Sequence, residues 1–218
     1  GNKIRLPFGV ELVRRIGALG GTDEDFNLIR EQGMDIFDSF ASQFMKRIRL
    51  IKDDRACFHF VDDAVAIRIP AIKRPSLEDL QRSWNNIRSI ESDHSTEDET
   101  ILRFATVLKS EEDSINGEIY ERRIVKLRTD GKLFGFQHRE WLVKHQDNAE
   151  AIPDPNARAA LKALLGSAYS DFSGIVVVDG NGDRGVPYAG IGGWRWRGIW
   201  HWLYRGFFQR GRIAVSGK

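Results

Sequence analysis

The fold is decided by the stretch IVVVDGNGD at residues 175–183. Its four consecutive β-branched residues predict a buried strand, and the Asp, Gly and Asn residues that follow predict a tight turn. The residues beyond the turn, 184–218, are rich in glycine and aromatic side chains, and we expect them to be extended. This part of the chain therefore indicates strands joined by a hairpin.

Two other regions also indicate strands. Residues 56–61 and 65–72 alternate between apolar and polar side chains around Asp62-Asp63, which predicts a second hairpin. Residues 96–110 fit either a helix or a buried strand, because periodicity alone does not separate the two.

A third hairpin is expected around Asp130-Gly131, which separates residues 118–128 from residues 132–143. Asp-Gly between two extended runs is the strongest short hairpin signal, because both central positions of the turn need a positive φ.

Three segments carry helix patterns. Ser76 to Asp79 form a capping box, and Asp154-Pro155 places proline at a first helical position. The helix that starts at Ser76 would bury Leu77, Leu80, Trp84 and Ile87. The longest pattern follows Thr22 and predicts a core-facing stripe formed by Phe26, Ile29, Gly33, Phe37, Phe40 and Phe44.

These patterns predict an α+β protein with a largely antiparallel β-sheet built from hairpins and about three to four helices packed on it. The chain has 218 residues, of which 41% are hydrophobic and 29% charged, so wholesale disorder is excluded. We expect a single domain over residues 1–218, with residues 1–21 as an N-terminal arm and residues 184–218 as a basic, aromatic-rich segment.

Charge is unevenly distributed along the chain. Residues 184–218 hold six arginines, one lysine and no acidic residue, a charge of +7. Because the whole chain carries +2, the other 183 residues carry −5. Four of the six tryptophans also lie in this last segment, so it is the most informative part of the sequence for function.

Taken as a strand, the segment separates its side chains onto two faces. One face would carry Trp194, Trp196, Trp200, Trp202 and Tyr204, and the other Arg195, Arg197, His201 and Arg205. In one interpretation the tryptophans fill the core, while the arginines are solvated or paired with acidic residues elsewhere. In the other, the basic residues contact nucleic acid or an acidic protein surface. The candidate binding residues are Arg195, Arg197, His201, Arg205, Arg210 and Arg212.

An alternative hypothesis is a nuclease-like hydrolase that acts on nucleic acid. His138 and Glu140 would share a face of a strand and serve in acid–base chemistry, and Asp62 and Asp63 follow a predicted strand. An exposed polar strand face and a simple turn explain the same residues without catalysis. With Cys57 as the only cysteine, zinc sites that need two thiolates are excluded, and we expect neither a metal nor a cofactor.

A third hypothesis is a self-assembling structural subunit, because opposed charge poles suit head-to-tail association into a homo-oligomer. The sequence contains no apolar run near the ~20 residues that span a bilayer. We therefore expect a cytoplasmic protein without a membrane partner.

Overall fold

The computed structural model describes residues 17–18, 20, 22, 24, 39, 41–50, 57–164, 167–192 and 195–217, apart from the side chains of 191 and 192. The chain divides into two compact units, Gly1–Lys52 and Asp53–Lys218. The expected single domain stays a prediction.

In the first unit, residues 41–50 are helical. All of the predicted stripe residues from Phe26 to Phe40 lie outside the described residues, as does nearly all of the expected arm. Phe44 lies in the helix with 40% of its surface exposed. The expected burial of the stripe is therefore wrong at Phe44, since the described residues of this unit do not enclose it.

The second unit is built on a nine-stranded sheet whose main path runs in the order β1-β4-β11-β6-β8-β7-β3, with β2 beside β4 and β9 beside β8. Its strands are β1 (His59–Val61), β2 (Ile67–Ile69), β3 (Ile87–Asp93), β4 (Thr100–Thr106), β6 (Tyr169–Asp171), β7 (Ile175–Asp179), β8 (Arg184–Gly192), β9 (Arg195–Trp202) and β11 (Gly211–Ser216). A second sheet pairs β5 (Ser114–Ile115) with β10 (Phe207–Phe208).

The expected α+β class is confirmed, with two corrections. The sheet is mixed rather than purely antiparallel, because β11 runs parallel to β6. The described residues of this unit form five helices rather than three to four: α4 (Leu77–Ser83), α5 (Gly117–Thr129), α6 (Phe136–His145), α7 (Pro155–Ala163) and the short 3₁₀ helix η1 (Leu203–Arg205).

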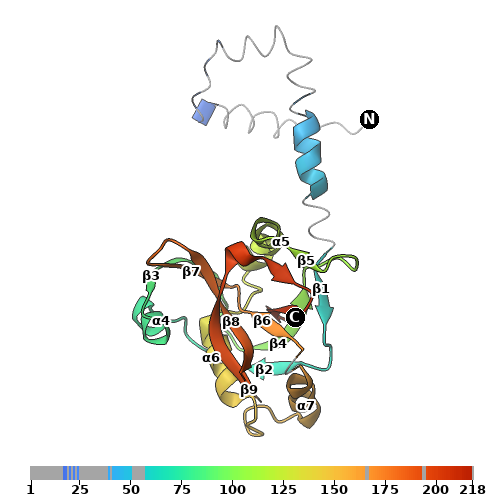
Figure 1. Cartoon of the computed structure of the whole chain (residues 1–218), viewed down its shortest axis with the longest axis vertical. Helices are drawn as coiled ribbons and strands as arrows, with labels where there is room; N and C mark the ends of the chain where they lie inside the picture. The colour runs from blue at the N-terminus through green and yellow to red at the C-terminus, as the bar shows by residue number, and fades with distance from the viewer. Residues whose placement is uncertain are drawn as a thin grey trace. The chain divides into compact units, whose positions relative to one another are not determined.

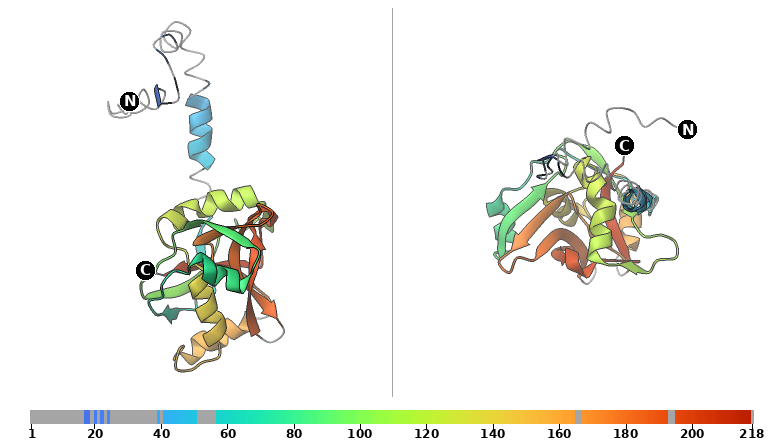
Figure 2. Two further views of the ribbon diagram at one scale, coloured as in Figure 1. Left: turned by 90° about the vertical axis from the view of Figure 1, so that its left-hand side faces the viewer. Right: turned by 90° about the horizontal axis from the view of Figure 1, so that it is seen from above.

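Helices cover both faces of the sheet, and Figures 1 and 2 show strands lying between α5 and the pair α6 and α7. On one face, Tyr120 and Ile124 of α5 pack on Val176 and Val186. On the other, Leu142 of α6 and Ala157 and Leu161 of α7 pack in a cluster with Phe104 and Ala214. Burial on both faces explains the continuous apolar run of β7. None of the helices in the described part of the chain is long and apolar enough to cross a membrane.

The hairpin predicted for residues 56–72 is wrong. β1 and β2 both pair antiparallel with β4, one after the other along its edge. Asp62 lies between them with φ of 56°, a conformation that Asp tolerates better than most residues. A shared partner strand thus satisfies the same alternating pattern that a hairpin would.

The hairpin predicted at Asp130-Gly131 is also wrong, because the flanking segments are the helices α5 and α6. Gly131 has φ of 65° as the residue that ends α5. The Gly131 N–H donates to the Arg128 carbonyl at 3.0 Å, and the Lys132 N–H donates to the Leu127 carbonyl at 2.9 Å. This is a Schellman motif, in which glycine is preferred for the same positive φ that suits a hairpin turn.

Two of the three predicted helix starts are confirmed, while the residues after Thr22 lie largely outside the described part of the chain. Ser76 accepts a hydrogen bond from the Asp79 N–H, and Asp154 accepts one from the Asn156 N–H at the start of α7. The helix that follows Ser76 is shorter than expected, since α4 ends at Ser83 and Ile87 begins β3. Residues 100–106 form β4, which resolves the alternative between helix and strand in favour of the strand.

The stretch 175–183 forms the expected strand and turn. Asp179 ends β7, and its Oδ1 accepts hydrogen bonds from the N–H groups of Asn181 and Asp183 at 2.9 and 2.8 Å. Gly182 follows with φ of 87°. The chain then continues into β8, which pairs antiparallel with β7.

Candidate functional site

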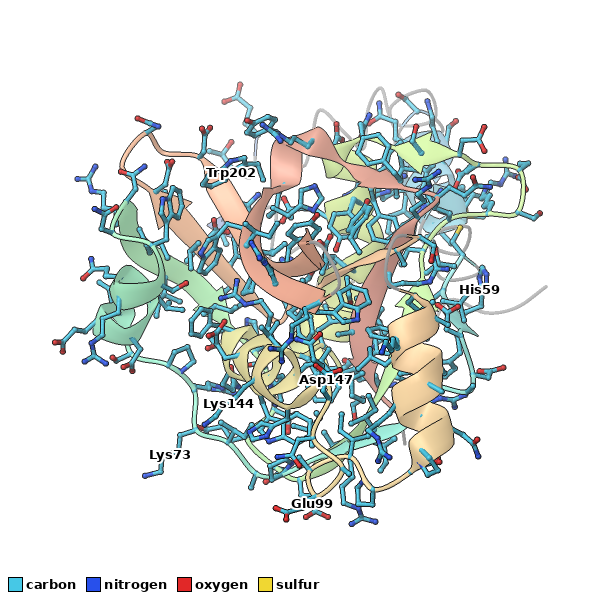
Figure 3. All side chains as sticks on the ribbon, turned by 60° about the horizontal axis from the view of Figure 1, so that its bottom comes forward. His59, Lys73, Glu99, Lys144, Asp147 and Trp202 are labelled. Carbon is cyan, nitrogen blue, oxygen red and sulfur yellow. The ribbon has the colours of Figure 1, made fainter. Side chains whose placement is uncertain are left out.

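The C-terminal segment presents its alternating side chains on a two-stranded ribbon formed by β8 and β9. Directly opposite residues of antiparallel strands share a face, and the register pairs Val186 with His201, Tyr188 with Ile199, and Gly190 with Arg197. The ribbon therefore has one face with arginine, histidine and tyrosine, and another face with tryptophan. Figure 3 labels Asp147, which pairs with Arg195 at the start of β9, and Trp202, the last residue of β9.

The tryptophan face belongs to the core. Trp196 is buried, and its indole N–H donates to the Leu161 carbonyl at 3.2 Å. The ring of Trp200 stacks on Phe136 with centroids 5.9 Å apart. The structural interpretation of the tryptophans therefore holds for these residues.

Two side chains of the α6 region fix the outer edge of β9. The Gln146 amide accepts from the Trp196 N–H at 2.8 Å and donates to the Trp196 carbonyl at 3.1 Å, so it occupies the place of a neighbouring strand. Arg139, whose side chain is 1% exposed, donates to the Ile199 carbonyl at 2.6 Å and to Glu140 at 2.7 Å. These contacts hold the ribbon rigidly against α6.

Gly190 shapes the opposite face. A Cβ atom on Gly190 would lie 2.4 Å from the hydroxyl oxygen and 2.6 Å from Cζ of Tyr188. The Tyr188 ring therefore lies along the strand over Gly190 instead of standing upright from the sheet. Ile199 beside it is 47% exposed, so this part of the ribbon is open. We call the set Tyr169, Tyr188, Arg197, Ile199 and His201 the open face.

Tyr169 and His201 complete the aromatic surface. The Tyr169 ring centroid lies 5.4 Å from that of Tyr188 and 6.0 Å from that of His201. The Tyr169 hydroxyl accepts a hydrogen bond from the Phe208 N–H at 3.0 Å. Burial and the charge of Asp171 raise the pKa of Tyr169, and the same two causes raise the pKa of Tyr188. Both hydroxyls therefore stay protonated at neutral pH.

A buried carboxylate lies beneath this surface. His201 Nδ1 is 3.1 and 3.0 Å from the two oxygens of Asp171, and a carboxylate accepts hydrogen bonds, so Nδ1–H is the donor. The Tyr120 hydroxyl donates to Asp171 at 2.9 Å, and Ser173 is 2.7 Å from that hydroxyl. Burial alone lowers the pKa of His201, but attraction to Asp171 and this hydrogen bond outweigh it, so the pKa is raised.

The basic residues of the segment divide into two groups. Arg195 pairs with Asp147 at 3.2 Å, and Arg212 pairs with Asp62. Within the described ranges, no ion pair engages Arg197, Arg205 and Arg210. Arg205 ends η1, which directly follows β9, and its positive charge lowers the pKa of His201.

The four candidate catalytic residues have separate surroundings. His138 is fully buried in α6, where its Nδ1 accepts from the Gly135 N–H at 3.1 Å, and burial lowers its pKa to about 3. Glu140 pairs with Arg139, Asp62 with Arg212 and Asp63 with Arg103. Across the part of the chain that the structure describes, no three His, Cys, Asp or Glu side chains gather as a metal site.

Sequence reasoning missed Asp171, Tyr169 and Tyr188 as members of the site. Tyr169 and Asp171 come from β6, which pairs with the distant strand β11, and Tyr188 lies in a segment that was expected only to be extended. The one usable feature is Asp171 beside Phe172, shortly ahead of the apolar run of β7, since a charged residue in a buried strand needs a partner.

The comparisons with known proteins identify no relative. No protein-family model, no curated protein and no solved structure shows significant similarity to this chain.

Proposed function

We propose that this protein binds single-stranded nucleic acid on its open face. The observation that carries the proposal is the partly exposed Tyr188 ring, which lies over Gly190 beside the exposed Ile199 and beside Arg197, with which no described carboxylate pairs. A flat, accessible ring is a surface on which a base can stack, and stacking tolerates any sequence because every base has a π-face.

The charge of the surface supports a polyanionic ligand. Arg197 lies on the open face, and Arg205 lies close enough to His201 to affect its pKa. Guanidinium groups donate in a planar fork that matches phosphate oxygens. Arginines beside rings therefore fit a ligand that alternates phosphates with flat bases.

A single strand fits this surface better than a duplex. In a duplex the base faces are stacked on one another, so the tyrosine rings would have nothing to stack on, and only phosphates would remain for the arginines. The sheet face instead offers rings and charges together, which suits unpaired bases. We therefore expect single strands to bind more tightly than duplexes of equal length.

The proposal is tested by a salt titration with fluorescent single- and double-stranded oligonucleotides of mixed sequence. The test variant is Arg197→Gln/Arg205→Gln. Its matched control, Arg68→Gln/Arg82→Gln, removes two exposed arginines that pair with Glu99 and with Glu78 and Asp79, and it changes the net charge equally.

We expect the test variant to reduce the slope of log K against log salt by about 0.7 for each arginine–phosphate pair that it removes on single strands. The control should keep the slope of the unmodified protein. Absence of binding at low salt would overturn the proposal. So would equal slopes in both variants. In that event, a defined oligomer in light scattering would support the self-assembling subunit, and capture of acidic peptides would support an acidic protein partner.

A further inference from the structure

The open face contains a histidine oriented as a general base. Asp171 is fully buried and accepts from both His201 Nδ1–H and the Tyr120 hydroxyl, so the carboxylate is fixed on two sides. An immobile carboxylate behind Nδ1 sets the tautomer of the imidazole and the direction of its ring.

The other ring nitrogen faces outward. With Nδ1 held by Asp171, Nε2 lies on the opposite side of the ring, and no described residue forms a hydrogen bond with it. It is not one of the unsatisfied polar atoms that are buried, and the side chain is 11% exposed, so Nε2 reaches the surface. It is therefore accessible to a ligand on the open face.

The groups around His201 match the needs of phosphodiester chemistry. Tyr169 and Tyr188 flank the ring with centroids 6.0 Å from it, and both carry protonated hydroxyls because their pKa values are raised. Arg205 and Arg197 supply positive charge for a phosphate whose charge grows in the transition state. His201, the Tyr188 ring and Arg197 thus follow one another along the same face of the ribbon, on the path that a bound strand would take.

We propose that His201 and Asp171 make the open face an RNA-cleaving site that uses the 2′-hydroxyl of the bound strand as the nucleophile. This inference rests on the proposed binding function. His201 is the catalytic residue, and Asp171 is a positioning residue.

In the proposed step, His201 Nε2 takes the proton from the 2′-hydroxyl as the 2′-oxygen forms a bond to the adjacent phosphorus. The bond from phosphorus to the 5′-oxygen breaks, and a solvent water molecule gives its proton to that leaving oxygen. The products are a 2′,3′-cyclic phosphate and a free 5′-hydroxyl. The hydroxide that remains takes the proton from His201, so His201 is restored, no water molecule is consumed overall and no oxidant is needed.

The experiment incubates the full chain with an end-labelled single-stranded RNA and with DNA of the same sequence, and measures binding and cleavage in the same samples. We expect both strands to bind and only RNA to be cut, with a cyclic phosphate on the 5′ fragment. Replacing one ribonucleotide by its 2′-deoxy form should abolish the cut at that position alone.

The variants separate catalysis from binding and folding. His201→Gln should reduce the cleavage rate by roughly 10²–10⁴-fold, the usual contribution of a general base, while RNA binding stays within a few-fold. His59→Gln, a change at a histidine on β1 that bonds to the Cys57 carbonyl, serves as the matched control and should cleave like the unmodified protein.

Asp171→Asn tests the positioning role through the pH profile. The rate should rise with pH as His201 loses its proton. Removing the Asp171 charge should shift this rise in rate to lower pH. The reason is that Asp171 raises the pKa of His201, whereas burial and the charge of Arg205 lower it. Titration of the His201 ring by NMR in the same variant should show the same downward shift, and it confirms that the variant is folded.

Two results would overturn the inference. RNA binding without cleavage leaves the proposed function intact and removes the catalytic one. Cleavage that survives His201→Gln undiminished assigns the activity to another group. Failure of both strands to bind at low salt refutes the proposed function itself, and the two failures are therefore distinguishable.

Discussion

Replacing Gly190 by alanine should weaken binding of single strands without unfolding the protein. The new Cβ would lie 2.4 Å from the Tyr188 hydroxyl oxygen and 2.8 Å from its Cε1 atom. Ordinary contacts lie at about 3.5–4.0 Å, so the tip of the ring must retreat by about 1 Å. Tyr188 is partly exposed, so we expect its ring to move away from the strand surface and to offer a base a poorer platform.

The expected weakening follows from the stacking of a base on this ring. One base stacked on an aromatic ring contributes about 1–3 kcal/mol, so the dissociation constant should rise about 5- to 150-fold. Tyr188→Ala should weaken binding to a similar extent. The double variant Gly190→Ala/Tyr188→Ala should be no worse than Tyr188→Ala, because both changes act on the same ring. Fluorescence anisotropy with a labelled oligonucleotide measures all four proteins.

Gly185 supplies the matched control on the same strand. A Cβ there would lie 2.9 Å from Cζ3 and 3.0 Å from Cε3 of Trp202, on the tryptophan face. Gly185→Ala should therefore lower the free energy of unfolding and leave the affinity unchanged. Unchanged affinity in both Gly190→Ala and Tyr188→Ala would refute the idea that this ring receives a base.

Three further predictions concern stability. Gly131→Val should destabilise the protein by about 1–2 kcal/mol in urea unfolding, because a residue with a Cβ resists the φ of 65° that ends α5; Gly131→Asn should cost less. His138 has a pKa lowered from 6.5 to about 3, so its contribution is complete above about pH 6.5 and is lost as the pH falls, by about 1.4 kcal/mol per pH unit. His138→Gln should remove that part of the acid dependence, and an unchanged slope of unfolding free energy against pH would contradict it. Arg139→Met should cost about 1.5–3 kcal/mol, because it removes charged hydrogen bonds to Glu140 and the Ile199 carbonyl; an unaltered urea midpoint would show that β9 is held by other contacts.

Local signals in the sequence predicted local structure well. Ser76 with Asp79, Asp154 with Pro155 and the apolar run of β7 each act within a few residues, and all three form as expected. The signal at Gly131 correctly indicates a positive φ, but this conformation serves helix ends and hairpin turns alike. The hairpin prediction fails because its two flanking segments are helical rather than extended.

Local sequence patterns do not predict which strands pair with each other. β1 and β2 look like the arms of a hairpin because each alternates apolar and polar residues around an acidic turn. Their real partner, β4, begins about 30 residues later and accommodates both in succession. The parallel contact between β6 and β11 likewise joins segments about 40 residues apart, and no property of either segment indicates it.

For the same reason, the sequence predicted only the basic residues of the candidate site. Arg197 and His201 lie on the strand whose alternation suggested a binding face, and the structure places them together on the open face. Asp171 and Tyr169 come from β6, which neighbours β8 through pairs such as Asp171 with Tyr188. The acid that orients His201 is therefore visible only once the sheet is assembled.

The charge pattern had two interpretations, and the structure divides the arginines between them. Arg184 pairs with Glu91 and Glu121, Arg195 with Asp147, and Arg212 with Asp62, so acidic residues outside the segment neutralise half of its arginines. These ion pairs explain part of the charge difference between residues 184–218 and the rest of the chain, because the opposite charges neutralise each other within the protein.

The remaining arginines do not fit that explanation. Arg197 and Arg205 lie beside an aromatic surface, and among the described residues no carboxylate pairs with them. Asp171 is the acidic group of the His201 network, yet it is buried under His201 and already accepts hydrogen bonds from His201 and Tyr120. An aromatic surface with arginines that no described carboxylate pairs with, above a carboxylate whose oxygens already accept hydrogen bonds, is attractive to an anion that carries rings. For this reason we propose the open face, and not the basic segment as a whole, as the binding surface.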